Sequence, residues 1–201
     1  NKRLMVPVLI GHTSSEFFSK PNVKTKDELK DMAVKMFGDN ADEFLRLCQF
    51  ESGTIEEIVE RAAVSGIEYA IRVAGKANVD TGANVPIYYY NFDAEIPGWD
   101  NPGTFHSVDL WFFFETLAKC WRPFVGKHYD LARQMCNYWA NFIRSGDPNG
   151  KDVTGEDMPQ WNPYTPDEPF GMVFKDKPEF TREEPSDLMN FLVDEFSPRK
   201  Q

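Results

Sequence analysis

The chain has 201 residues, of which 41% are hydrophobic and 14% are aromatic. A chain of this length buries about 70% of its unfolded surface, and disordered chains are poor in aromatic residues, so the composition excludes a mainly disordered protein. The 22 Lys and Arg residues against 32 Asp and Glu residues give a net charge of −10. No cluster of Lys and Arg exceeds two residues. This charge argues against nucleic acid as a partner, because a phosphate backbone is repelled.

Hydropathy and cysteine usage set further limits. No stretch approaches the roughly 20 consecutive apolar residues that a membrane-spanning helix needs, so no membrane partner is expected. Cys48, Cys120 and Cys136 are an odd number and form no Cys-x-x-Cys pair. They therefore indicate neither a disulfide framework nor a zinc site, and we expect three small buried hydrophobic side chains. The chain fits a reducing compartment, the bacterial cytoplasm.

The predicted elements begin with a strand and continue with helices. The apolar run at 5–11 is typical of a strand buried on both faces, as in a parallel sheet. Capping boxes at 25–28 and 54–57 predict two helix starts, and Gly38 is expected to end the first of these helices. A further short helix is expected over 42–48.

The second part of the chain repeats this alternation. The aromatic run at 85–92 predicts a second central strand, and 129–145 predicts a helix ended by Gly146. Turn-forming residues fill 145–157, including an Asp-x-Asn-x-Lys segment that we interpret as a turn rather than a calcium loop. A short strand is expected at 170–174 and a closing helix at 186–196. The fold class is α/β, and two central strands are too few for a complete sheet.

The histidines differ in their settings. His106 follows the strand at 85–92 in a Gly/Pro loop, which is where α/β enzymes place acid–base groups. The alternative is a loop histidine that only hydrogen-bonds backbone. His128 is expected to be exposed at a helix start, and His12 stays ambiguous. Glu16 follows the first strand, so its carboxylate could meet His106 at the carboxyl end of the sheet and fix the tautomer of the ring. Its alternative is an exposed loop acid.

Three segments carry a family resemblance. Segment 8–16 resembles the strand and turn that hold the acidic triad member in type-B carboxylesterases, the family of cholinesterases and p-nitrobenzyl esterases, with Gly11 and Glu16 in place. Segment 103–110 resembles the histidine loop of that family, although Asp109 stands where Glu is more usual and the Phe-Gly that usually follows is not obvious. Segments 139–149 and 161–164 are similar to the late helix, the Gly-Asp-Pro-Asn turn and the Trp-Pro-x-Tyr segment, with the order Trp-Asn-Pro-Tyr here.

The resemblance implies fold and activity together. It implies that residues 1–201 are the C-terminal part of a single α/β-hydrolase domain, a three-layer fold with a mostly parallel central sheet. It also implies a carboxylic-ester hydrolase with a Ser-His-Glu triad, in which His106 and Glu16 are catalytic and no metal or cofactor takes part. Aromatic residues near His106 are expected to line the substrate pocket, namely Phe105, Trp99 and Trp111. The aromatic runs at 88–90 and 111–114 are otherwise expected to form core.

The nucleophile of such an enzyme is not in this sequence. The serine of this fold sits in a Gly-x-Ser-x-Gly turn, and neither that motif nor a Gly-Gly pair for the oxyanion hole occurs here. We therefore expect the chain to be inactive alone, to work with an upstream nucleophile-bearing part of the same protein, and to self-associate through uncovered apolar surface. Its small-molecule partner would be a carboxylic ester. Two alternatives stay open, namely a cholinesterase-like adhesion module without activity and a fragment with no independent role.

Overall fold

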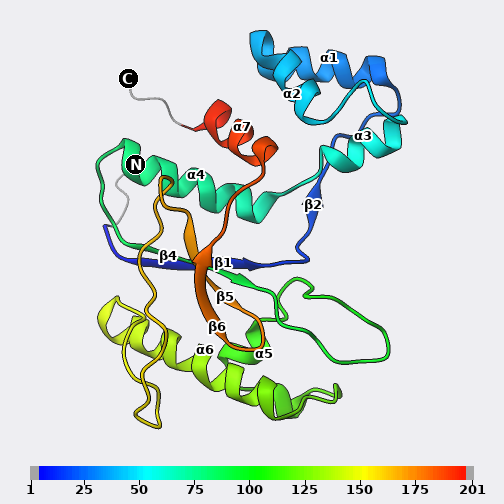
Figure 1. Ribbon diagram of the computed structural model, residues 1–201. Helices are drawn as coiled ribbons and strands as arrows, with labels where there is room; N and C mark the ends of the chain where they lie inside the picture. The colour runs from blue at the N-terminus through cyan, green and yellow to red at the C-terminus, as the bar shows by residue number, and fades with distance from the viewer. Residues whose placement is uncertain (1–4, 198–201) are drawn as a thin grey trace. The chain divides into compact units, whose positions relative to one another are not determined.

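The computed structural model describes residues 5–197, and these form two compact units. The first unit contains the residues up to 16 together with 74–184, and the second contains 17–73 together with the residues from 185 onward. The boundary falls inside helix α4 (Gly66–Asp80), a helix that the sequence analysis left unassigned (Figure 1).

A mixed sheet forms the centre of the first unit. Its order is β1 (Val8–Thr13), β4 (Ile87–Phe92), β5 (Phe170–Phe174) and β6 (Pro178–Arg182) (Figure 1). The first three strands are parallel and β6 is antiparallel to β5. The parallel arrangement predicted from the apolar runs is thus confirmed, although β1 begins later than the predicted strand at 5–11 and extends beyond Gly11.

The parallel strands approach one another closely at two glycines. A Cβ atom on Gly11 would lie 2.3 Å from the Tyr90 carbonyl oxygen, and one on Gly171 would lie 3.2 Å from the Tyr89 carbonyl oxygen. Neither position has room for a side chain. Gly11 is therefore required by the close approach of backbone, and Gly171 chiefly by the Tyr89 ring, whose Cδ1 would lie 2.5 Å from the added Cβ.

Helices cover one face of this sheet. Helix α5 (Leu110–Phe113), the 3₁₀ turn η2 (Leu117–Lys119) and helix α6 (Gly126–Ser145) lie together there (Figure 1). The core between them and the sheet is aromatic, with Trp161 fully buried and packed edge-on against Tyr138 at 5.4 Å between ring centroids. The predicted core run at 88–90 is buried, whereas Phe114 is 66% exposed, so the prediction of core throughout 111–114 is wrong at its end.

The second unit is mainly helical. It contains α1 (Lys26–Phe37), the 3₁₀ turn η1 (Gly38–Asn40), α2 (Ala41–Leu47), α3 (Ile55–Arg61) and α7 (Asp187–Phe196), with a short antiparallel pair of β2 (Phe18–Ser19) and β3 (Val64–Ser65). Leu29, Phe44, Ile58 and Leu188 meet in its core. The predicted helix starts are confirmed, since Thr25 and Thr54 each accept a hydrogen bond from the backbone N–H three residues on. Only Thr54–Glu57 forms the complete reciprocal box.

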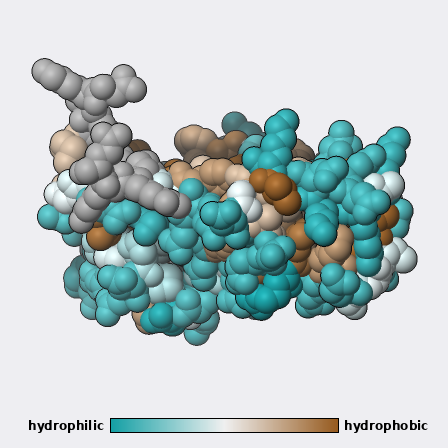
Figure 2. Space-filling model, turned by 90° about the horizontal axis from the view of Figure 1, so that it is seen from above, coloured by the Kyte–Doolittle hydropathy of each residue, from teal (hydrophilic) through white to brown (hydrophobic). Residues whose placement is uncertain are grey.

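Some hydrophobic side chains are exposed at the surface among hydrophilic ones. Figure 2 shows brown, hydrophobic residues between teal, hydrophilic residues on one face of the molecule. Phe17 and Phe18 are 73% and 57% exposed. None of the helices within the described range is long and apolar enough to cross a membrane.

Candidate active site

The site is built at the carboxyl end of β1. The strand ends at Thr13, and the chain turns so that the Glu16 side chain points back toward it. Glu16 Oε1 accepts hydrogen bonds from the Thr13 amide at 3.2 Å and the Thr13 hydroxyl at 3.0 Å. Glu16 is buried, with only 4% of its side chain exposed. A buried carboxylate needs such donors, because they replace the water that it loses.

His106 reaches the same carboxylate from another loop. Its Nδ1 lies 2.7 Å from Glu16 Oε2, and 44% of its side chain is exposed. Because a carboxylate only accepts hydrogen bonds, Nδ1 donates, and the neutral ring carries its lone pair on Nε2. The loop bends sharply here, since Gly103 and Ser107 have φ angles of +62° and +69°. The lone pair on His106 Nε2 takes no part in the Glu16 contact, as a general base requires.

Backbone and hydroxyl groups join the two loops. Ser15 forms an isolated parallel bridge with Phe105, and its amide donates to the Thr104 carbonyl at 3.3 Å. The Thr104 hydroxyl contacts the Ser14 hydroxyl and donates to the Ser15 hydroxyl at 3.3 Å. Thr104 is buried. The distance between His106 and Glu16 is therefore fixed by contacts on residues next to both.

Charge distribution supports an ionised Glu16. Burial by itself raises the pKa of Glu16, but the hydrogen bonds from His106 and Thr13, together with the His106 charge, outweigh burial and lower this pKa below its ordinary value. Asp109, also buried, behaves in the opposite way. Burial raises its pKa, helped by the nearby Glu16 charge, although the Tyr90 hydroxyl donates to it at 2.8 Å. Two carboxylates close together thus have pKa values that are shifted apart.

Comparison with known proteins identifies the family of this chain. The model of the carboxylesterase family matches residues 2–190. The chain belongs to the carboxylesterase family. Carboxylesterase 4A of Bos taurus is 30% identical over 124 residues, which are 57% of this chain and 20% of that protein. Acetylcholinesterase of Gallus gallus is 34% identical over 85 residues, which are 40% of this chain and 10% of that protein.

Solved structures show the fold. A PNB esterase superposes with a TM-score of 0.61 and 18% identity, covering 92% of this chain and 38% of that one. An esterase of Clostridium hathewayi, described as hydrolysing aliphatic aromatic polyesters, superposes with a TM-score of 0.54 and covers 94% of this chain and 37% of that one. The chain thus spans well under half of these structures. Its fold is that of a portion of an α/β-hydrolase, as the sequence predicted for a C-terminal part.

The three predicted pocket aromatics differ in their positions in this chain. Phe105, which directly precedes His106 in the sequence, packs edge-on against Trp111 at 5.8 Å between ring centroids. Trp99 is 89% exposed, and its ring lies 6.5 Å from that of Trp121. The structure therefore groups two of the three residues in one aromatic cluster and places Trp99 in a different contact.

The structure also places the other histidines and the cysteines. His128 is buried rather than exposed, so the prediction is wrong, and its Nδ1 accepts the Val125 amide at 3.0 Å and so caps α6. Cys48 is buried as predicted, and burial raises the pKa of its thiol to about 11, whereas Cys120 and Cys136 are only partly buried. His12 is buried, with Nε2 2.8 Å from the Tyr89 hydroxyl.

Sequence reasoning missed two residues that shape the site. Thr13 donates its hydroxyl to the Glu16 carboxylate. A hydroxyl residue three positions before an acid is a sequence pattern from which this contact could have been predicted. Arg122 forms a bidentate ion pair with Asp100, both distances being 2.9 Å, and donates to the Pro97 carbonyl at 3.0 Å. It also lies over the Phe105 ring at 5.7 Å. No local pattern predicts that contact, which joins residues far apart in the chain.

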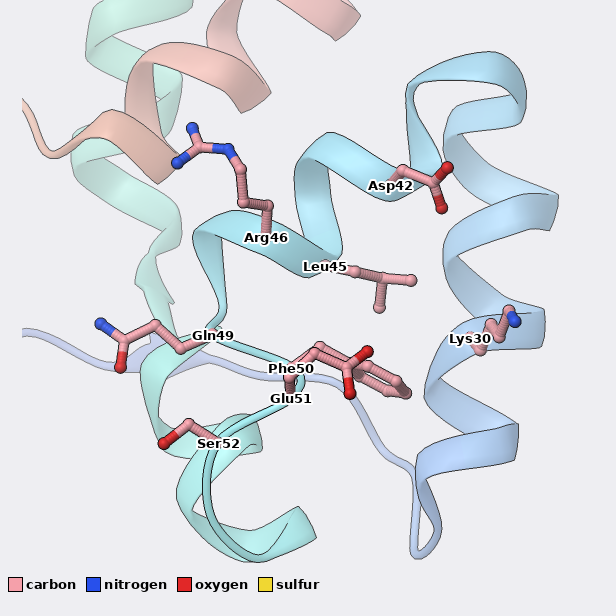
Figure 3. A pocket seen from close by; sticks show the side chains of 8 residues that line it. All are labelled: Lys30, Asp42, Leu45, Arg46, Gln49, Phe50, Glu51 and Ser52. Carbon is pink, nitrogen blue, oxygen red and sulfur yellow. The ribbon is translucent and has the colours of Figure 1, made fainter.

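A cavity of about 530 Å³ lies in the second unit, between α1, α2 and the turn at 49–52 (Figure 3). In Figure 3 Leu45 and Phe50 point toward α1, while Arg46, Gln49 and Ser52 point away from it. Leu45 and Phe50 are the apolar residues of its lining, and the other lining residues are charged or polar. Neither His106 nor Glu16 belongs to this unit, and we assign the cavity no role in ester chemistry.

Proposed function

We propose that this chain supplies the general base and the acidic member of a Ser-His-Glu triad in a serine carboxylesterase acting on a small carboxylic ester. The nucleophilic serine and the oxyanion hole would come from an upstream segment outside these 201 residues. The observation that carries the proposal is the 2.7 Å contact between His106 Nδ1 and Glu16 Oε2, two side chains that are 90 positions apart. Family membership supports the same chemistry.

Each residue has one role in the proposed reaction. Glu16 fixes the tautomer of His106 and stabilises the imidazolium that forms. His106 Nε2 accepts the proton of the serine hydroxyl as it attacks the ester carbonyl, and then donates it to the leaving alcohol. In the second half-reaction the same nitrogen takes a proton from water as the water oxygen attacks the acyl-enzyme. It then donates that proton to the serine oxygen as the acyl–serine bond breaks and the carboxylic acid leaves. Phe105, Trp111 and Trp99 would line the pocket for the acyl or alcohol group.

The chain by itself is proposed to be inactive. Members of a catalytic triad act as a unit, so the loss of the nucleophile removes most of the rate that the other two members support. Oxyanion stabilisation, usually the largest single contribution, would also be missing. We further propose that the isolated chain self-associates and belongs in a reducing compartment.

The test is hydrolysis of a p-nitrophenyl ester by the 201-residue chain alone and after co-expression with the upstream part of the same protein. We expect no turnover above background for the chain alone and turnover in the co-expressed sample, abolished by His106→Gln. Turnover by the chain alone would contradict the proposed origin of the nucleophile. A folded co-expressed complex that binds a protein partner but hydrolyses nothing would favour the adhesion module instead.

A further inference from the structure

We propose that Thr13 is a positioning residue for the His106–Glu16 pair, holding one carboxylate oxygen so that the other is presented to the histidine. This inference rests on the proposed function, because it assigns a residue to the same site. Thr13 is 1% exposed and is the last residue of β1, paired in register with Phe92. Its position is therefore set by the sheet rather than by a loop.

Two donors of Thr13 converge on a single atom. The hydroxyl donates to Glu16 Oε1 at 3.0 Å and the amide donates to the same oxygen at 3.2 Å, while His106 contacts Oε2 at 2.7 Å. The last torsion of a glutamate is soft, so a carboxylate rotates easily unless it is held. Hydrogen bonds to an ionised acceptor are stronger than hydrogen bonds between neutral groups. The two carboxylate oxygens of Glu16 are therefore held by different residues, Oε1 by Thr13 and Oε2 by His106.

The backbone of Thr13 is itself held by buried neighbours. His12 Nδ1 lies 2.9 Å from the Thr13 carbonyl, which only accepts, so Nδ1 donates. Nε2 of the same ring lies 2.8 Å from the Tyr89 hydroxyl. The Ser14 amide, which belongs to the same peptide group as the Thr13 carbonyl, donates to the Phe92 carbonyl at 2.9 Å. The peptide group that follows Thr13 is thus held at both its carbonyl and its amide, which limits the directions open to the Thr13 hydroxyl.

The test uses NMR of the full 201-residue chain. Thr13→Val keeps the shape of the side chain and removes the hydroxyl, Thr13→Ser keeps the hydroxyl, and Thr116→Val is the matched control in the same unit, where the hydroxyl makes only a 3.5 Å contact. His106→Gln assigns the His106 signal. The readouts are the titration midpoint of the Glu16 side-chain carbon and the His106 Nδ1 proton resonance.

Loss of a donor destabilises the carboxylate, so we expect Thr13→Val to raise the Glu16 midpoint by about one pH unit and to broaden the Nδ1 proton signal. Thr13→Ser and Thr116→Val should match the wild-type chain. The proposal is overturned when Thr13→Val leaves both readouts unchanged, or when Thr13→Ser shifts them as far as Thr13→Val does, since packing would then be the cause.

Activity separates this inference from the proposed function. In the co-expressed esterase, Thr13→Val should lower kcat about tenfold and leave KM within about twofold, because the effect falls on the base rather than on substrate binding. An inactive wild-type complex would refute the proposed function, whereas the NMR readouts do not depend on turnover and would still decide the role of Thr13.

Discussion

Glu16 combines burial with ionisation, and this links the stability of the chain to pH. Its folded-state pKa lies below the ordinary value of 4.5. As pH falls, the unfolded chain therefore takes up the proton first. The stabilisation by ionised Glu16 is complete above pH 4.5 and is lost as the pH falls through the folded-state pKa.

We therefore predict that Glu16→Gln is destabilised at about pH 6 and that its deficit relative to wild type narrows toward about pH 3. Urea unfolding at a series of pH values measures this difference. Glu156→Gln, at an exposed position of the same unit, is the control and should follow wild type. A deficit that stays constant over this range would mean that Glu16 is not held as an ionised group.

At the scale of elements, the central strands depend on glycine where they meet. Gly11→Ala would place a Cβ 2.3 Å from the Tyr90 carbonyl oxygen, and backbone atoms cannot move aside as a side chain can. We predict a loss of about 1–3 kcal/mol in the free energy of unfolding, as in other overpacked cores. Gly126→Ala, with nothing within 4 Å of the new Cβ, should be neutral or stabilising. Equal losses for the two variants would contradict the close approach of β1 and β4.

The start of α6 gives a second prediction at this scale. Burial lowers the pKa of His128 below 6.5, and the neighbouring Lys127 charge adds to this effect. The folded chain thus keeps the ring neutral while the unfolded chain protonates, so the contribution of His128 to stability is complete above pH 6.5 and falls as pH decreases through 6.5 toward the folded-state pKa. Protonation also removes the acceptor that caps Val125.

His128→Asn keeps an acceptor near the position of Nδ1 and removes the titration. We expect the variant to lose less stability than wild type between about pH 7.5 and about pH 5 in thermal or urea unfolding. The same decrease in both chains would show that the cap does not depend on the charge of His128.

At the scale of the whole molecule, the alternation of strands and helices was predicted better than the edge strand of the sheet and the residues at which helices begin. Continuous apolar runs identified β4 and β5 because strands buried on both faces have few polar residues. The same pattern identified β1, although its first four residues are only partly buried, so the expectation of burial on both faces is wrong for this strand. Strand β6 was missed, since an edge strand that begins with Pro178 and carries Glu179 and Arg182 has the composition of a loop. Helix α6 begins three residues before the predicted start at 129, because a histidine, not Ser or Thr, supplies the cap.

The contact between His106 and Glu16 could be predicted from the sequence, but the contacts that hold the residues of the candidate site in place could not. His106 and Glu16 follow strands of one sheet, and the carboxyl ends of parallel strands share an edge. Thr13 and Arg122 act through contacts that depend on the folded backbone. The number of strands also follows only from the structure, in which β1 pairs with β4 alone among the described residues.

This sheet edge supports a prediction about the isolated chain. An open edge and exposed apolar side chains favour association, so we expect light scattering to report species larger than 23.2 kDa, with the mass rising with concentration. Co-expression with the upstream part should abolish this behaviour. A monodisperse monomer with a sharp unfolding transition would count against it.

Fluorophosphonate labelling of the co-expressed protein, read as the intact mass of every polypeptide, tests the central claim most directly. We predict one adduct on the upstream polypeptide, none on the 201-residue chain, and no adduct when His106 is replaced by Gln in a complex that still assembles. An adduct on the 201-residue chain, or labelling that is unchanged by His106→Gln, would contradict the assignment of His106 and Glu16 to a triad with an upstream serine.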